Sequence, residues 1–128
     1  MDIIEKYFHL REETDEIIGV GIEARKHLGS GFLEIVYKDA LEFEFREKRI
    51  NFEREKKYII SYKETILPHQ FYADFVVFDK VILEIKAKNG IAEEDMAQTL
   101  NYLKCSGCKV GLILNFGKSK LGIKRVVF

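Results

Sequence analysis

An excess of charge of either sign is what this sequence most clearly lacks. Its 21 Lys and Arg residues are balanced by 21 Asp and Glu residues, so the formal net charge is zero. Such a balance does not attract the whole molecule to nucleic acid, and any such binding has to depend on a local basic patch. The sequence also lacks an apolar run long enough to span a membrane and an N-terminal signal-peptide pattern. We therefore expect a cytoplasmic protein with no membrane partner.

Cysteine is scarce as well. Cys105 and Cys108 are the only two, and no second Cys or His pair lies at the spacing that a structural zinc site requires. A thioredoxin-like redox motif begins a helix, whereas this pair follows a predicted one. His9, His27 and His69 are scattered and suggest no metal triad. The pair is interpreted as ordinary reduced cysteines at a helix end.

The composition is that of one domain with a substantial core. The chain has 128 residues, of which 47% are hydrophobic, and it contains neither repeats nor low-complexity tracts. Residues 1–128 are therefore expected to form a single domain.

Hydrophobic periodicity and turn residues predict the order ααβββαββ. The predicted helices cover residues 14–28, 32–48 and 92–104, and the predicted strands cover residues 52–62, 66–78, 81–88, 109–116 and 123–128. Residues 1–13 form either a polar lead-in or a further short helix. This order is typical of an α/β fold with a mixed β-sheet flanked by helices, in which a crossover helix joins two parallel strands.

The predicted helices have apolar stripes at helical spacing. The stripe of residues 32–48 consists of Leu33, Val36, Tyr37, Ala40, Leu41 and Phe45. The stripe of residues 92–104 consists of Met96, Leu100 and Leu103. We expect both stripes to face the sheet.

Three charged residues interrupt two otherwise apolar strands. Asp74 lies in the strand of residues 66–78, and Glu84 and Lys86 lie in the next strand. Apolar residues on both faces indicate central strands that are covered on both sides. Burying an unpaired carboxylate there costs on the order of several kcal/mol. A divalent metal ion would offset that cost.

The loop between these strands decides whether the carboxylates meet. A two-residue turn at residues 79–80 would direct Asp74 away from Glu84. A three-residue loop at 78–80 instead places Val77 opposite Val81, and Asp74 then faces Glu84. Asp79 at the loop centre tolerates the left-handed conformation that such loops need. We therefore predict an odd loop or a bulge. The opposite face is then wholly apolar, with Phe75, Val77, Val81, Leu83, Ile85 and Ala87.

Two converging carboxylates supply hard oxygen ligands suited to Mg²⁺ or Mn²⁺. The carbonyl of Ile85 offers a third oxygen. Lys86, beside them, can orient a bound water or stabilise charge on a phosphate. The residues alone leave two interpretations open, a phosphodiester-hydrolysis site and a structural ion cluster at the end of the sheet.

The pattern resembles that of the PD-(D/E)XK nuclease superfamily, whose fold is restriction-endonuclease-like. The resemblance consists of Asp74, the run Glu84-Ile85-Lys86 and a following helix with Gln98 and Tyr102. The segment from Gly31 to Tyr37 is similar to the GxxExxY signature of a small family in that superfamily. The resemblance covers nearly the whole chain. Ala73 stands where the motif has Pro, which is often absent there.

The resemblance implies a role for each matching residue. The metal ligands would be Asp74, Glu84, the Ile85 carbonyl and Glu34. The catalytic groups would be Asp74, Glu84, Lys86 and Gln98. Tyr102 would support the site or contact nucleic acid. The basic cluster of Lys118, Lys120, Lys124 and Arg125 offers phosphate contacts, with Lys118 and Lys120 as the main candidates.

Each of these assignments has a simpler alternative. Glu34 in a first helical turn is favoured by the helix dipole and can pair with Lys38. Glu23 is another acidic donor, or a solvated surface charge. Gln98 and Tyr102 can make ordinary hydrogen bonds, and the basic cluster can be a solvated loop.

The sequence thus predicts a metal-dependent nuclease-like domain that hydrolyses DNA or RNA phosphodiester bonds with Mg²⁺ or Mn²⁺. The alternative is a non-catalytic module that retains the fold and binds nucleic acid or protein. A homodimer that pairs through exposed strands such as residues 52–62 and an unidentified protein partner both stay open.

Overall fold

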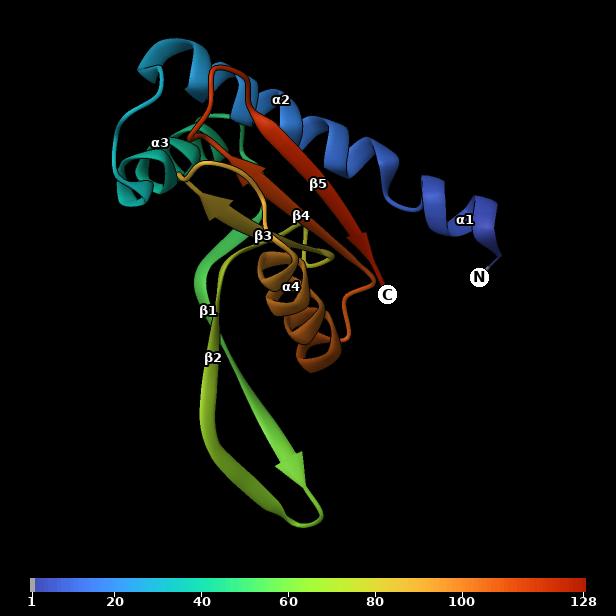
Figure 1. Cartoon of the computed structure of the whole chain (residues 1–128). Coiled ribbons are helices and arrows are strands. Elements are labelled where there is room, and N and C mark those ends of the chain that lie inside the picture. Colours follow the sequence, from blue (N-terminus) through green and yellow to red (C-terminus); the bar gives the residue numbers. More distant parts are fainter. Residues whose placement is uncertain (1) are drawn as a thin grey trace.

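The fold is a five-stranded mixed sheet with helices on both faces (Figure 1). The computed structural model describes residues 2–128. The strands lie in chain order, β1-β2-β3-β4-β5, with β3 and β4 parallel and the other pairs antiparallel. The strands are β1 Phe52–Tyr62, β2 Thr65–Val77, β3 Val81–Lys86, β4 Val110–Asn115 and β5 Gly122–Val127. The helices are α1 Ile3–Phe8, α2 Arg11–Leu28, α3 Glu34–Glu47 and α4 Glu93–Ser106.

The predicted order of elements is therefore confirmed. Of the two alternatives for residues 1–13, a polar lead-in or a short helix, the structure has the short helix α1. Within residues 2–128, no helix is both long and apolar enough to cross a membrane. Helix α4 connects the parallel pair β3 and β4, as expected of a crossover.

Two hydrophobic clusters sandwich the sheet. On one face, α2 and α3 pack against the sheet through side chains such as Ile17 and Tyr37. On the other face, α4 packs against it through Tyr102 and Leu103. Strand β3 is central, and all its residues except Lys86 are buried. The apolar face predicted for the β2–β3 hairpin lies in the cluster beneath α2 and α3.

The buried face of α4 differs from the predicted stripe. Met96 and Leu100 are only half-buried, and the buried residues are Asp95, Thr99, Tyr102 and Leu103. Close approach of the backbones explains the difference, because a Cβ added to Gly111 of β4 would lie 2.5 Å from the Thr99 side chain. A small residue is needed at that contact, so packing and not hydrophobicity selects the face. On α3, Leu33 precedes the helix and is exposed, whereas Tyr37, Leu41 and Phe45 are buried as predicted.

The β2–β3 connection is the predicted three-residue loop. The Lys80 N–H donates to the Val77 carbonyl at 3.1 Å. Phe78 and Asp79 have φ values of +58° and +57°, the pattern of a type I′ turn. Val77 pairs with Val81 and Phe75 with Leu83. The register that directs Asp74 toward Glu84 is thereby confirmed.

The β1–β2 hairpin changes its facing at Asp74. Phe75 lies in the cluster beneath α2 and α3, whereas Ala73 lies in the cluster beneath α4. Residues two apart on a regular strand share a face, so β2 must turn over between them. Glu55 of β1, at the same level, has a φ of +54°, and neither it nor Asp74 belongs to the β1–β2 ladder, which runs directly from Arg54 to Lys56.

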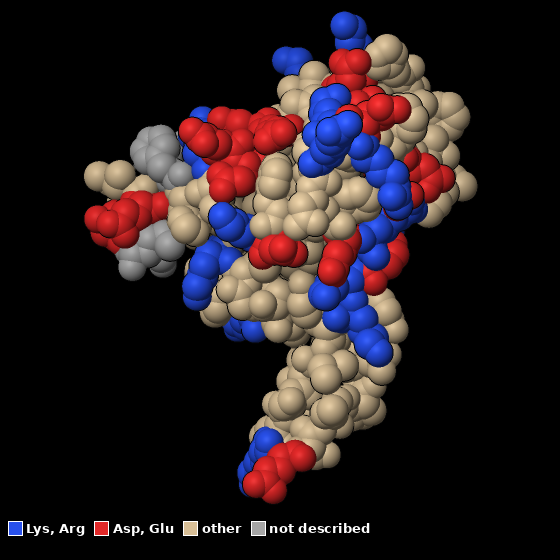
Figure 2. Space-filling model, turned by 180° about the vertical axis from the view of Figure 1, so that it is seen from behind, with Lys and Arg blue, Asp and Glu red and all other residues tan. Residues whose placement is uncertain are grey.

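Beyond that point the hairpin forms an arm that extends away from the sheet (Figure 1). Between Lys57 and Asp74, the only Lys, Arg, Asp or Glu residues are Lys63 and Glu64 at its tip. Figure 2 shows the arm as an uncharged projection with charges only at its end. Beyond Lys57, the arm is therefore free of Lys, Arg, Asp and Glu except at its tip.

Candidate active site

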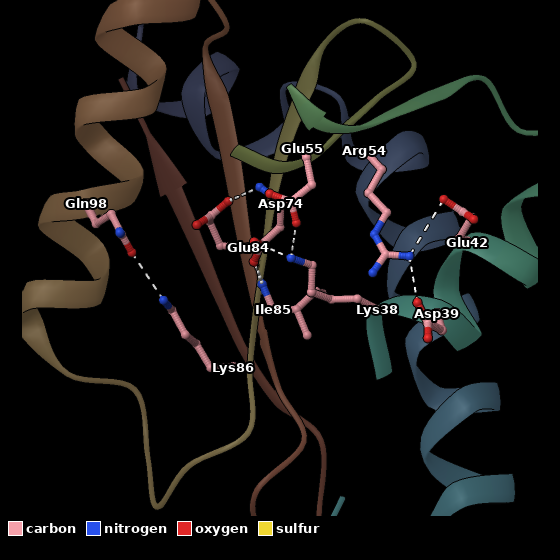
Figure 3. A network of polar contacts seen from close by, with 10 residues as sticks. All are labelled: Lys38, Asp39, Glu42, Arg54, Glu55, Asp74, Glu84, Ile85, Lys86 and Gln98. Atoms are coloured by element: carbon pink, nitrogen blue, oxygen red, sulfur yellow. Dashed lines mark hydrogen bonds and ion pairs between the residues drawn. The ribbon is translucent and has the colours of Figure 1, made fainter. Parts of the chain in front are cut away.

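Asp74 and Glu84 meet where β2 and β3 part (Figure 3). The β2–β3 ladder ends at Phe75 and Leu83, and side-chain contacts replace the next pair. The Asp74 N–H donates to Glu84 Oε2 at 2.7 Å, and the Ile85 N–H donates to Asp74 Oδ2 at 2.8 Å. Because the N–H and carbonyl of a strand residue point to the same side, the Ile85 carbonyl also faces this gap. The structure thus brings the three predicted oxygen donors together.

A lysine from α3 completes this cluster. Lys38 Nζ donates to Asp74 Oδ1 at 3.0 Å and also to Glu55 Oε1. The Lys38 side chain is buried, although it belongs to a surface-type residue. The sequence predicts Lys38 only as a partner of Glu34 and gives Glu55 no role. Glu55 has no place in the motif, and only the register opposite Asp74 could have pointed to it.

Lys86 extends from β3, the strand that also contains Glu84, toward α4. Its ammonium donates to Gln98 Oε1 at 3.1 Å and lies 3.9 Å from Asp95 Oδ1. Asp95 is buried and also pairs with Lys88 Nζ at 2.6 Å, while accepting the Ala92 N–H. Burial raises the pKa of Asp95, but Lys88 and the Ala92 N–H outweigh it and keep that pKa below its ordinary value. The first turn of α4 thus fixes both lysines that follow Glu84.

Asn115, at the end of β4, clamps the backbone after Lys86. Its side-chain amide donates to the Lys88 carbonyl and its oxygen accepts the Lys88 N–H, both at 3.0 Å. Gly117 lies against the same residue, since a Cβ there would be 2.0 Å from the Lys88 carbonyl oxygen. Lys118 follows, and its side chain lies beside Gly90. The β4–β5 loop is therefore packed on the segment that leaves the site.

The segment before Glu34 is pinned by Tyr37. Its hydroxyl donates to the Gly29 carbonyl at 2.7 Å and accepts the Phe32 N–H at 3.3 Å. Gly31, between these contacts, has a φ of +104°, which disfavours residues with a Cβ. The Gly, Glu and Tyr of the sequence pattern are thus a turn residue, the first residue of α3 and the side chain that holds the turn.

Comparisons with known proteins bear on the family and the fold of this chain. The sequence model of the PD-(D/E)XK nuclease superfamily matches residues 11–126. The chain belongs to that superfamily. The crystal structure of a protein named SSO0001 has the same fold, with a TM-score of 0.61 at 15% identity over 92% of this chain. The chain spans 59% of that protein's length. No curated protein matches the sequence.

These findings confirm a nuclease-like domain with the predicted restriction-endonuclease-like fold. In this PD-(D/E)XK domain Asp74 lies on β2, and Glu84 and Lys86 lie on β3. Gln98 contacts Lys86, and Tyr102 is buried against the sheet, not on the surface. Burial and the charges of Glu84 and Asp74 raise the pKa of Tyr102 to about 12. The Tyr102 side chain therefore interacts electrostatically with both carboxylates of the site.

Glu34 also interacts electrostatically with the charged residues of the site. Burial raises its pKa, the charge of Asp74 adds to the increase, and the charges of Lys86 and Lys38 lower it. Lys38 pairs with Glu55 and Asp74, so the simple pairing with Glu34 is not the observed one. The other acidic candidate, Glu23, is paired with His27 on the surface of α2. The surface alternative is thus the better description of Glu23.

The carboxylates match the chemistry of a divalent metal ion only in part. Burial and the Asp74 charge raise the pKa of Glu84 to about 8, and the charges of Lys86 and Lys38 offset this increase only in part. However, nowhere in residues 2–128 do three His, Cys, Asp or Glu side chains gather closely enough to hold a metal ion. The core of a candidate site therefore consists of Asp74, Glu84 and the Ile85 carbonyl, and the positive charges beside it are those of Lys86 and Lys38.

The raised pKa of Glu84 predicts how the stability of the metal-free protein depends on pH. The folded state favours the neutral acid, whereas the unfolded chain releases the proton near the ordinary pKa of 4.5. Stability from this group is therefore complete below that pH and is lost as pH rises toward about 8. The slope contributed by one such group is at most about 1.4 kcal/mol per pH unit.

Thermal unfolding with a chelator present, at pH 5 to 8, measures this effect. The unfolding temperature of wild type should fall more steeply with pH than that of Glu84→Gln. The surface substitution Glu23→Gln should leave the wild-type slope unchanged. Equal slopes for wild type and Glu84→Gln would contradict the prediction.

Proposed function

We propose that residues 1–128 form a single metal-dependent nuclease domain that hydrolyses phosphodiester bonds of DNA or RNA. The observation that carries the proposal is the meeting of Asp74 and Glu84 at the parting of β2 and β3, with Lys86 on the same face as Glu84. Both carboxylates are held by backbone N–H groups, so their positions are fixed before any ligand arrives. Oxygen ligands whose positions are fixed in advance are what phosphoryl chemistry needs.

In this proposal Asp74, Glu84 and the Ile85 carbonyl hold Mg²⁺ or Mn²⁺. Because no third carboxylate of residues 2–128 joins this pair closely enough to hold the ion directly, Glu34 contributes through water from the first turn of α3. A divalent ion bound there lowers the pKa of a water molecule and offsets phosphate charge. The hard oxygen donors favour these two metals over softer ones.

Lys86 is the proposed group that stabilises the charge that develops on the phosphate. Gln98 orients the Lys86 ammonium by accepting its hydrogen bond at 3.1 Å. Tyr102, buried between α4 and the sheet, is the proposed support for this side of the site. Lys118 and Lys120 lie exposed on the β4–β5 loop and are the proposed phosphate contacts outside the centre. Figure 2 shows acidic and basic side chains intermixed on one face of the molecule, which favours such local contacts over a uniformly basic groove.

We also propose membership in the GxxExxY family within the superfamily. The support is that the residues of the motif act together: Gly31 permits the turn before Glu34, and Tyr37 holds that turn in place. A cytoplasmic location is part of the same proposal.

One observation favours the non-catalytic alternative. Both oxygens of Asp74 already have partners, one in Lys38 and one in the Ile85 N–H. A module that only binds nucleic acid or protein would keep such a neutralised carboxylate.

A substrate panel separates the two functions. Single-stranded, duplex and branched DNA and RNA are incubated with the protein and Mg²⁺ or Mn²⁺, or with a chelator. We expect cleavage of at least one substrate with either metal and none with the chelator. Binding of nucleic acid with no cleavage, together with no heat of Mn²⁺ binding in calorimetry, would support the binding module.

A further inference from the structure

Lys38 is a buried cation that the proposed chemistry does not use. Its ammonium lies between carboxylates from two strands, Asp74 of β2 and Glu55 of β1 (Figure 3). A lysine rarely becomes this buried unless it is paired. Here it has two partners, and only one of them belongs to the carboxylate pair of the site.

The second partner is held in an unusual way. Glu55 lies in the middle of β1 with a φ of +54°, a conformation that is unfavourable for a residue with a Cβ. It interrupts the ladder between Arg54 and Lys56 and directs the carboxylate to Lys38. The Glu55 side chain remains 49% exposed, so it can accept the ammonium without being buried itself.

The contact on Asp74 uses one of its two oxygens. Oδ1 accepts from Lys38, and Oδ2 accepts the Ile85 N–H. A divalent ion on Asp74 would meet the Lys38 ammonium at close range, and the two positive charges would repel each other. Glu55 gives the ammonium a carboxylate to retain when it leaves Asp74.

We propose that Lys38 is a positioning residue that competes with the metal for Asp74. Without metal it neutralises Asp74 and holds its carboxylate. With metal it gives up Oδ1 and stays paired with Glu55. This inference rests on the proposed metal site, but it concerns the affinity of that site and not the cleavage step.

Calorimetric titration with Mn²⁺, together with thermal unfolding with and without Mn²⁺, tests the competition. Lys38→Met should bind Mn²⁺ about tenfold more tightly than wild type, a coupling in the usual range between two sites. It should also unfold at a lower temperature without metal and regain the difference when Mn²⁺ is present. Lys48→Met, at the residue that caps the C-terminus of the same helix, removes an exposed ion pair with Glu44 and serves as the matched control.

Glu55→Gln tests the same idea from the other side. With its second partner weakened, Lys38 should hold Asp74 more strongly, and Mn²⁺ should bind more weakly than to wild type. A merely structural role would lower the stability of both variants and leave their Mn²⁺ affinities equal. If Lys38→Met fails to fold, the affinity of Glu55→Gln still decides the question.

The outcomes separate this inference from the proposed function. Opposite shifts in Mn²⁺ affinity for the two variants would support it, as would binding by Lys38→Met alone. Equal binding by wild type and both variants would overturn the inference and leave the metal site intact. No Mn²⁺ binding by any of the proteins would overturn both.

Discussion

Lys86→Ala and Asp74→Asn are each expected to lower the rate of phosphodiester cleavage by about 100-fold or more. Lys86→Ala removes the ammonium that is proposed to face the phosphate. Asp74→Asn removes the negative charge that is proposed to hold the metal. Both substitutions leave the apolar side of the hairpin unchanged, so the fold should survive. Initial rates on the best substrate of the panel, at saturating Mg²⁺, give the comparison.

Lys80→Ala is the matched control for these two variants. Lys80 lies in the loop of the same hairpin, at the other end of the strands, and its side chain is 59% exposed. Its rate should equal that of wild type. If both Lys86→Ala and Asp74→Asn cleave at the wild-type rate, the carboxylate pair is not the active site.

The core of the candidate site could be predicted because its determinants are local. Asp74 and Glu84 lie ten residues apart on one hairpin, and a single loop sets their register. The preference of Asp79 for a left-handed conformation favoured the odd loop, which the structure confirms. A charged residue in an apolar strand is also recognisable in the sequence, because burying an unpaired charge is energetically unfavourable.

The rest of the cluster could not be predicted because it depends on contacts between distant segments. Lys38 reaches Asp74 from a helix 36 residues earlier in the chain. Glu55 reaches Lys38 only because β1 leaves the regular strand conformation, which an alternating sequence pattern does not show. The face of α4 was mispredicted for a similar reason, since Thr99 packs on the bare backbone of Gly111. Hydrophobic periodicity reports burial averaged over a helix and not the closest contact between backbones.

The function of small residues is likewise visible only in three dimensions. Gly117 and Gly19 are both glycines without a positive φ, and the sequence does not distinguish them. Gly19 lies on the exposed side of α2, where an added Cβ would meet nothing within 4 Å. Gly117 lies against the Lys88 backbone beside the clamp made by Asn115.

Substitution of these two glycines by alanine should therefore change stability in opposite directions. Gly117→Ala places a Cβ 2.0 Å from the Lys88 carbonyl oxygen, and a backbone atom cannot move aside as a flexible side chain can. We expect it to lower the free energy of unfolding by on the order of 3 kcal/mol or more. That loss corresponds to a fall in the unfolding temperature of about 10 °C. Gly19→Ala should instead stabilise the protein by up to about 1 kcal/mol, because alanine is the better helix former.

Denaturant unfolding of both variants measures the two free energies directly. The loss in Gly117→Ala should come with a functional effect, because the displaced Lys88 is paired with Asp95, which lies beside Lys86. Under the proposed function, its cleavage rate should fall even at temperatures where the variant is fully folded, while Gly19→Ala keeps the wild-type rate. A Gly117→Ala protein as stable as wild type would show that the β4–β5 loop can move away from Lys88. The clamp by Asn115 would then not hold the segment that leaves the site.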